Sequence, residues 1–123
     1  MVRDFTYIDD IVEGVVRVTD KPATPSAVYD PGAPDPSTSS APYRVFNIGN
    51  SEPTPLMDYI VALEKASGIV AKKEFLPMQP GDVPATSADT SELDAWVGFK
   101  PNTPVDVGVA RFYAWYREHH GLA

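Results

Sequence analysis

The sequence has 123 residues, of which 43% are hydrophobic, and a formal net charge of −7. This is enough chain for one domain with an apolar core, while the acidic balance argues against a nucleic-acid-binding protein and the lack of cysteine excludes disulfides and cysteine-ligated zinc. No apolar run approaches the ~20 residues of a membrane span and no signal-peptide pattern opens the chain, so we expect a cytoplasmic protein.

The first predicted elements are a short strand and a helix. Residues 5–8 are aromatic and β-branched, which favours a strand. Asp10 stands three residues before Glu13, the spacing of a capping box, and this predicts the start of a helix. The side chains expected on its apolar face are Ile11, Val12, Val15 and Val16.

Residues 20–42 differ sharply in composition from the rest of the chain. They are rich in proline, serine, threonine and alanine and contain few large apolar side chains. Such a stretch buries too little surface to offset the entropy of ordering it. We therefore expect an exposed loop inserted between two core elements.

The middle of the chain predicts a strand, a helix and a further strand. Residues 43–48 predict a strand, and Thr54 is expected to cap a helix with Pro55 at its first position. Gly68 is placed to end this helix, and residues 72–76 form the third predicted strand. The apolar stripe of the helix is expected to contain Leu56, Ile60 and Leu63.

Two more helices complete the chain. Asp89 and Glu92 form a second capping box before a short helix that Gly98 ends. The pair Thr103-Pro104 opens a last helix, with apolar residues at helical spacing. About three strands alternating with four helices indicate an α/β fold.

Motifs for a self-sufficient active site are missing from the sequence. It has no G-x-G-x-x-G, no phosphate-binding P-loop and no G-x-S-x-G. The two histidines, His119 and His120, are adjacent and would point about 100° apart on a helix, so they cannot chelate one metal as an i, i+4 pair can. We predict no catalytic, cofactor-binding or metal-binding residue in this chain.

Two places carry residues suited to binding. Arg3 lies at the first strand beside an aspartate, where it either forms a surface ion pair or captures a phosphate through two hydrogen bonds. The second place is the turn-rich segment 78–86, with Gln79, Asp82 and Thr86. These three residues either shape the turns or bind a ligand from a loop.

Four segments in order also carry a family resemblance. They read R-D-F-T-Y-I-D-D-I-V-E-G-V, Y-R-V-F-N-I-G-N-S, L-P-M-Q-P-G-D-V-P-A-T-S-A-D and V-G-F-K-P-N-T-P-V-D-V-G-V-A-R-F-Y-A-W-Y-R. Together they resemble the C-terminal part of the extended short-chain dehydrogenase/reductase (SDR) nucleotide-sugar epimerases, and within these the UDP-glucuronate 4-epimerase family. The resemblance covers essentially the whole chain.

The resemblance implies roles for the candidate residues. In the family, an N-terminal Rossmann domain binds NAD and carries a catalytic Tyr-x-x-x-Lys pair, and the C-terminal part holds the UDP group. Arg3 would then contact the diphosphate of a UDP-sugar, and Gln79, Asp82 and Thr86 would lie near the nucleotide or its phosphates. Related epimerases often have arginine at the position of Gln79.

The Tyr-x-x-x-Lys pair has no counterpart in this sequence. Its nearest approximation is Tyr113 with Arg117, and arginine does not readily relay protons. We therefore expect residues 1–123 to be a single substrate-binding region without the NAD-binding Rossmann domain, inactive when isolated and binding no NAD by itself.

Apolar surface left uncovered in such a region would bind the Rossmann half, in cis or in trans, or lead to self-association. Two alternatives stay open at this point. The chain could belong to a related SDR dehydratase or decarboxylase, or it could be a free-standing module that binds nucleotide sugars without catalysis.

Overall fold

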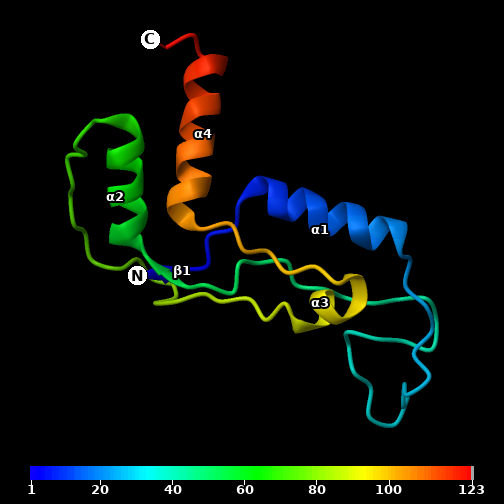
Figure 1. Ribbon diagram of the computed structural model, residues 1–123. Coiled ribbons are helices and arrows are strands. Elements are labelled where there is room, and N and C mark those ends of the chain that lie inside the picture. Colours follow the sequence, from blue (N-terminus) through cyan, green and yellow to red (C-terminus); the bar gives the residue numbers. More distant parts are fainter. Residues whose placement is uncertain (123) are drawn as a thin grey trace.

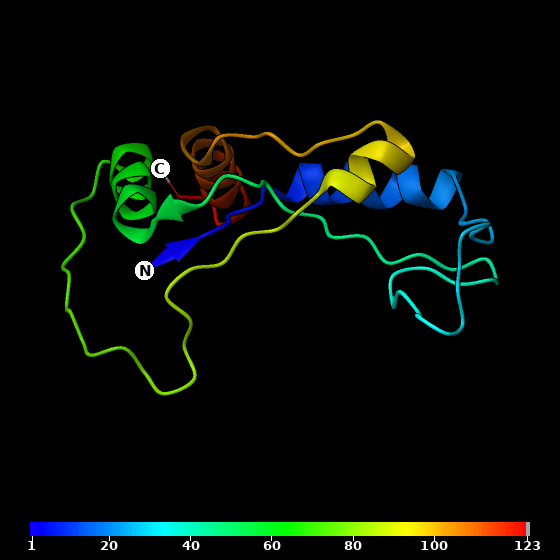
Figure 2. The same cartoon turned by 90° about the horizontal axis from the view of Figure 1, so that it is seen from below.

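The computed structural model describes residues 1–122, which form four helices and one two-stranded sheet. The elements lie in two groups joined by extended chain (Figures 1 and 2). At one end α2 lies along α4, and at the other α1 packs against α3. In chain order the elements are β1 (Val2–Arg3), α1 (Ile8–Asp20), β2 (Thr54–Pro55), α2 (Leu56–Ser67), α3 (Ser91–Val97) and α4 (Val105–His119).

The predicted mixture of strands and four helices is confirmed, but the three predicted strand positions are wrong. Residues 5–8, 43–48 and 72–76 do not form strands. The two observed strands, β1 and β2, are two residues each and pair antiparallel. A strand needs a neighbouring backbone as well as suitable side chains. In the predicted strand 43–48, backbone pairing is limited to the isolated bridge between Arg44 and Thr38 and the bond from the Val45 N–H to the Ser37 carbonyl, which is too little for a strand.

The predicted helix ends are confirmed at two glycines. Gly68 ends α2 with φ of 70°, and Gly98 ends α3 with φ of 63°. Both angles lie in the left-handed region that glycine adopts without a steric penalty. These stops are local properties of the chain, and so the sequence was sufficient to locate them.

The capping box predicted at Asp10 and Glu13 is wrong. Helix α1 begins at Ile8, so both residues lie inside the helix. The Asp10 carboxylate accepts a hydrogen bond from the Thr103 backbone N–H at 3.0 Å, and Glu13 forms an ion pair with Arg17 one turn later. A long-range contact to the segment before α4 has replaced the local cap.

The capping box predicted at Asp89 and Glu92 is also wrong, because the residue before α3 is Thr90 and no side chain caps the helix. The Asp89 carboxylate accepts hydrogen bonds from the Ser91 side chain and backbone, and these lower the pKa of Asp89 below its ordinary value. Helices α2 and α4 begin directly after Pro55 and Pro104, which occupy the residue before the first helical turn.

The core of this molecule is small for its size. Only Leu93 and Val109 are buried among the large apolar side chains of residues 1–122. The accessible surface is 8652 Å², whereas a compact protein of 13.4 kDa exposes about 6,500 Å². The apolar face expected on α1 is accordingly uncovered, with Val12, Val15 and Val16 about half exposed.

The proline-rich segment is an exposed loop, as predicted, and both of its ends meet one tryptophan. Trp96 of α3 lies under the guanidinium of Arg44 at 4.3 Å and the ammonium of Lys21 at 4.6 Å from the ring centroid. Its indole N–H also donates a hydrogen bond to the Lys21 carbonyl at 3.0 Å. Trp96 therefore joins the entry and the exit of the loop to α3.

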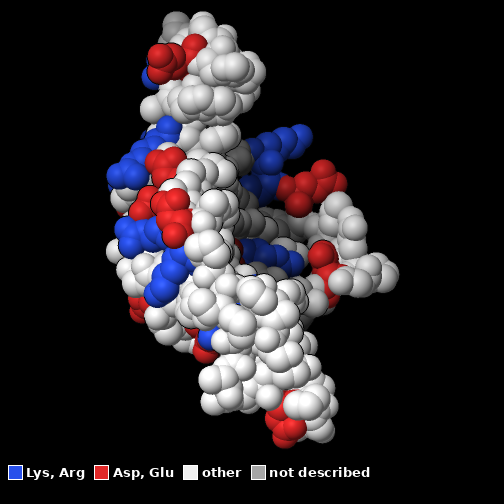
Figure 3. Space-filling view, turned by 90° about the vertical axis from the view of Figure 1, so that its right-hand side faces the viewer, with Lys and Arg blue, Asp and Glu red and all other residues white. Residues whose placement is uncertain are grey.

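The surface carries charges of both signs. On the face shown in Figure 3, lysine and arginine side chains are interspersed with aspartate and glutamate. None of the helices in residues 1–122 combines the length and the apolar character needed to cross a bilayer.

Candidate functional site

Strand β1 places Arg3 beside the segment that contains the other candidate residues. The Val2 N–H donates to the Pro84 carbonyl at 2.9 Å, and the Thr86 N–H donates to the Val2 carbonyl at 3.2 Å. On its other side β1 pairs with β2. The backbone of β1 is thus held between two segments that are more than fifty residues away in sequence.

The guanidinium of Arg3 is anchored through one of its nitrogens. Nη1 donates to the Val2 carbonyl at 2.9 Å and to the Val83 carbonyl at 2.8 Å. Nη2 lies 4.0 Å from a carboxylate oxygen of Asp82, and the Arg3 side chain is 23% exposed. Within residues 1–122, Nε and Nη2 make no hydrogen bond, so the edge that suits bidentate phosphate binding keeps its donors.

Asp82 and Thr86 complete the polar group around Arg3. Asp82 closes a turn by donating its N–H to the Gln79 carbonyl at 3.1 Å, with Gly81 at φ of +93°. The Thr86 hydroxyl accepts a hydrogen bond from the Asp4 N–H at 3.3 Å. The structure therefore brings Arg3, Asp82 and Thr86 together, while the exposed Gln79 joins them, within the described residues, only through its backbone.

One residue of this region was missed by sequence reasoning. The carboxylate of Asp4 accepts hydrogen bonds from the backbone N–H groups of Ser51 at 3.1 Å, Ala88 at 3.0 Å and Glu52 at 3.4 Å. From the sequence Asp4 was only a possible ion-pair partner of its neighbour Arg3. No local signal reveals the real contacts, because the donors lie 47 to 84 residues away.

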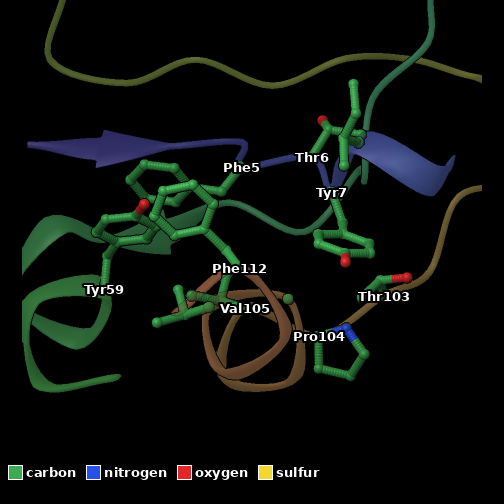
Figure 4. Close-up of a pocket in the computed structure, with 11 residues that line it drawn as sticks. Phe5, Thr6, Tyr7, Tyr59, Thr103, Pro104, Val105 and Phe112 are labelled. Carbon is green, nitrogen blue, oxygen red and sulfur yellow. The ribbon is translucent and has the colours of Figure 1, made fainter. Parts of the chain in front are cut away.

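A separate apolar cavity of about 250 Å³ lies between the first segment of the chain and helices α2 and α4. Figure 4 shows Phe5 and Tyr59 together at one side, where their rings stack at 4.2 Å, and Tyr7 beside Thr103 and Pro104 at the other. The lining offers few polar groups, so it suits packing better than reaction chemistry. It is formed by Phe5, Thr6, Tyr7, Ile8, Tyr59, Thr103, Pro104, Val105, Gly108, Val109 and Phe112.

The described residues do not fit a dinucleotide site or a metal centre. A Rossmann site needs a glycine-rich turn between a parallel strand and a helix. Here the helix that directly follows a strand is α2, and the junction Thr54–Pro55–Leu56 contains no glycine. No cluster of three or more histidine, aspartate or glutamate side chains in residues 1–122 is arranged to hold a metal ion.

The chain is similar to known proteins over essentially its whole length. A probable UDP-glucuronate 4-epimerase of Rhizobium meliloti is 46% identical over 124 residues, which is 100% of this chain and 36% of the relative. The UDP-glucose 4-epimerase of Bifidobacterium longum, solved with NAD+ and UDP, superposes with a TM-score of 0.74 and 25% identity over 99% of this chain and 32% of its own.

A third protein gives the same result. The UDP-glucuronic acid 4-epimerase of Bacillus cereus, solved with UDP-glucuronic acid and NAD, superposes with a TM-score of 0.70 and 29% identity over 96% of this chain and 32% of its own. No protein-family model matches the sequence. The chain thus spans about one third of the length of the proteins that it matches.

Proposed function

Because the chain resembles the C-terminal part of the extended SDR nucleotide-sugar epimerases over its whole length, we propose that it is the UDP-sugar-binding part of an NAD-dependent 4-epimerase. The proposed reaction of the whole enzyme interconverts UDP-glucuronate and UDP-galacturonate. NAD and the catalytic Tyr-x-x-x-Lys pair would be supplied by a Rossmann half, so this chain is inactive when isolated. The lack of cysteine fits a cytoplasmic setting.

The observation that carries this proposal is the arrangement of Arg3. Its guanidinium is fixed by two backbone carbonyls through Nη1, while Nε and Nη2 keep their donors within the described residues. Arginine presents such a pair of donors in the geometry that matches two oxygens of a phosphate. A cation that is already oriented loses less conformational entropy when it binds.

The neighbouring groups differ from Arg3 in what they can recognise. The Asp82 carboxylate accepts hydrogen bonds only, so it suits a sugar hydroxyl and not a phosphate. The Thr86 hydroxyl and the Gln79 amide can both donate and accept. We assign Arg3 to the diphosphate and the other three residues to the nucleotide and its hydroxyl groups.

The proposed contacts hold a UDP-sugar by its nucleotide and diphosphate and leave the sugar free. A 4-epimerase must let the sugar turn over while the nucleotide stays bound, because the stereochemistry at C4 is inverted. Binding energy concentrated on the diphosphate and nucleotide keeps the substrate in place without fixing the sugar. None of the residues assigned here moves a proton at C4, which the proposal leaves to the Rossmann half.

The proposed docking face for that half is α1. Ile8 is 61% exposed, and Val12, Val15 and Val16 continue the same apolar stripe. An exposed stripe of this kind on a helix is typical of a surface that binds a partner. We propose that the Rossmann half covers it, in cis or in trans.

Calorimetric titration with UDP tests the binding role of Arg3. Loss of a charge-assisted hydrogen bond costs about 1.5–3 kcal/mol, so Arg3→Ala should weaken UDP binding by roughly tenfold to a hundredfold. Uridine, which has no diphosphate, should bind both proteins equally. The matched control is Arg117→Ala, which removes an exposed arginine from the far end of α4. No UDP binding by the wild type, or equal affinity in Arg3→Ala, would contradict the proposal.

A further inference from the structure

Next to the proposed phosphate-binding arginine lies the carboxylate of Asp4, which forms no ion pair within residues 1–122. We propose that Asp4 is the positioning residue of this site: it holds Arg3 and Thr86 in the arrangement that binds the diphosphate and the nucleotide, respectively. The inference rests on the proposed function, because it specifies how the same site is kept in shape. Asp4 acts through its neighbours and is not assigned any contact with the substrate.

Three backbone donors from two distant segments converge on Asp4. Oδ2 accepts from Ser51 at 3.1 Å and Ala88 at 3.0 Å, and Oδ1 accepts from Glu52 at 3.4 Å. No arginine or lysine forms an ion pair with Asp4 within residues 1–122. Its charge is therefore balanced by peptide N–H groups, as in a site built for a fixed anion.

These contacts bear directly on the binding residues. The Asp4 N–H donates to the Thr86 hydroxyl, and Ala88, two residues further on, donates to the Asp4 carboxylate. The backbone of Val2, on the other side of Arg3, is bonded to Pro84 and Thr86. Arg3 is thus bracketed by two residues that are both tied to segment 84–88, so a shift of that segment moves Arg3 with it.

The segment on the other side of Asp4 is held in an unfavourable conformation. Ser51 has φ of +56°, which a residue with a Cβ adopts only at an energetic cost. It is kept there by the bond from its N–H to Asp4 and by its hydroxyl, which donates to the Ala88 carbonyl at 2.9 Å. When the carboxylate is removed, we expect Ser51 to relax and the junction of the three segments to loosen.

The test compares UDP and uridine binding in Asp4→Asn. An amide of the same size offers one acceptor oxygen and places an NH₂ group against backbone donors. We expect UDP to bind about tenfold more weakly and uridine to lose less affinity than UDP, because a displaced Arg3 affects only the diphosphate, whereas a shift of Thr86 affects both ligands. The matched control is Asp9→Asn, which removes the same charge from an exposed aspartate and should change neither affinity.

The ratio of the two affinities separates positioning from a general effect on folding. Partial unfolding of Asp4→Asn lowers the number of binding sites but leaves the ratio of UDP to uridine affinity unchanged. Hydrogen exchange at the Ser51 and Ala88 amides, which should become faster in Asp4→Asn, reports on the junction without any ligand.

Two results would overturn the inference alone: an unchanged UDP affinity in Asp4→Asn, or an equal loss of UDP and uridine binding. Unchanged exchange at the two amides would also overturn it. Failure of the wild type to bind UDP would instead overturn the proposed function, and this inference with it.

Discussion

At the scale of single residues, the close approach of two segments makes position 49 sensitive to side-chain size. A Cβ added to Gly49 would lie 2.4 Å from the Ala88 Cβ and 3.0 Å from a carboxylate oxygen of Asp4. Neither distance is compatible with van der Waals contact, so the backbone would have to move. Glycine is needed here because there is no space for a side chain.

We expect Gly49→Ala to lower the free energy of unfolding by about 1–3 kcal/mol, because overpacking a close contact forces backbone shifts of that cost. Urea unfolding measures the change. Gly32→Ala is the control, since its added methyl group would meet only the carboxylate of Asp30 in the exposed loop. Equal stability of Gly49→Ala and the wild type would show that the junction of segments around Asp4 is loose.

The sequence identified the candidate binding residues but not the contacts between them. The patterns identified Arg3 and the segment from Gln79 to Thr86 as separate candidates. That Arg3 lies beside Asp82 and Thr86 follows from the pairing of β1 with residues 84–86, which no local pattern encodes. Their role in binding UDP stays a prediction until the titrations are done.

At the scale of elements, Trp96 determines how the proline-rich loop is attached. The loop itself contains few apolar side chains, so its position depends on the contacts at its two ends. A cation over an indole ring contributes about 0.5–1 kcal/mol at an exposed site. Two such contacts and one hydrogen bond make Trp96 the main connection between the loop and α3.

Removal of this ring should release the loop. We expect Trp96→Ala to increase the rate of chymotrypsin cleavage at Tyr29, within the loop, by roughly tenfold, because cleavage follows the population of the open form. The control is Trp115→Ala, which removes a half-exposed tryptophan whose aromatic contacts, within residues 1–122, are with Phe112 and His119 of the same helix α4. Similar cleavage rates in the two variants would mean that other contacts hold the loop.

At the scale of the whole molecule, the main feature is an accessible surface area larger than that expected of a compact protein of the same mass. The excess over a compact protein is about 2,100 Å², which is more than twice the ~800 Å² that each partner contributes to a standard protein–protein interface. Much of the exposed apolar area of α1 comes from the valines of its stripe. We expect the isolated chain to cover this stripe by self-association.

Sedimentation analysis over a range of concentrations tests this expectation. Val12→Glu with Val16→Glu should weaken the association by at least about tenfold, because burying unpaired carboxylates is unfavourable. Val28→Glu, at a 90% exposed position of the loop, is the control. The same samples should show no turnover with NAD and UDP-glucuronate. A wild-type chain that is monomeric at every concentration would contradict the expected role of α1.

Several features of this protein depend on neighbouring residues and can be predicted from the amino-acid sequence alone. These are the approximate positions of the four helices, the glycine stops at Gly68 and Gly98, the exposed loop and the resemblance to the epimerases. Helical periodicity, a left-handed glycine and an apolar-poor composition are all local properties. They act in the same way whatever the rest of the chain does.

The positions of the strands, the role of Asp10 and the junction at Asp4 depend on contacts between distant parts of the chain. Residues 43–48 have suitable side chains for a strand, but within residues 1–122 their backbone pairs only at the isolated bridge between Thr38 and Arg44 and the adjoining bond from Val45 to Ser37. Asp10 bonds to Thr103 instead of capping α1. Asp4 gains its partners from segments 47 to 84 residues away. Hydrogen-bonding groups are satisfied wherever a partner is nearest in space, and distance along the sequence does not fix that position.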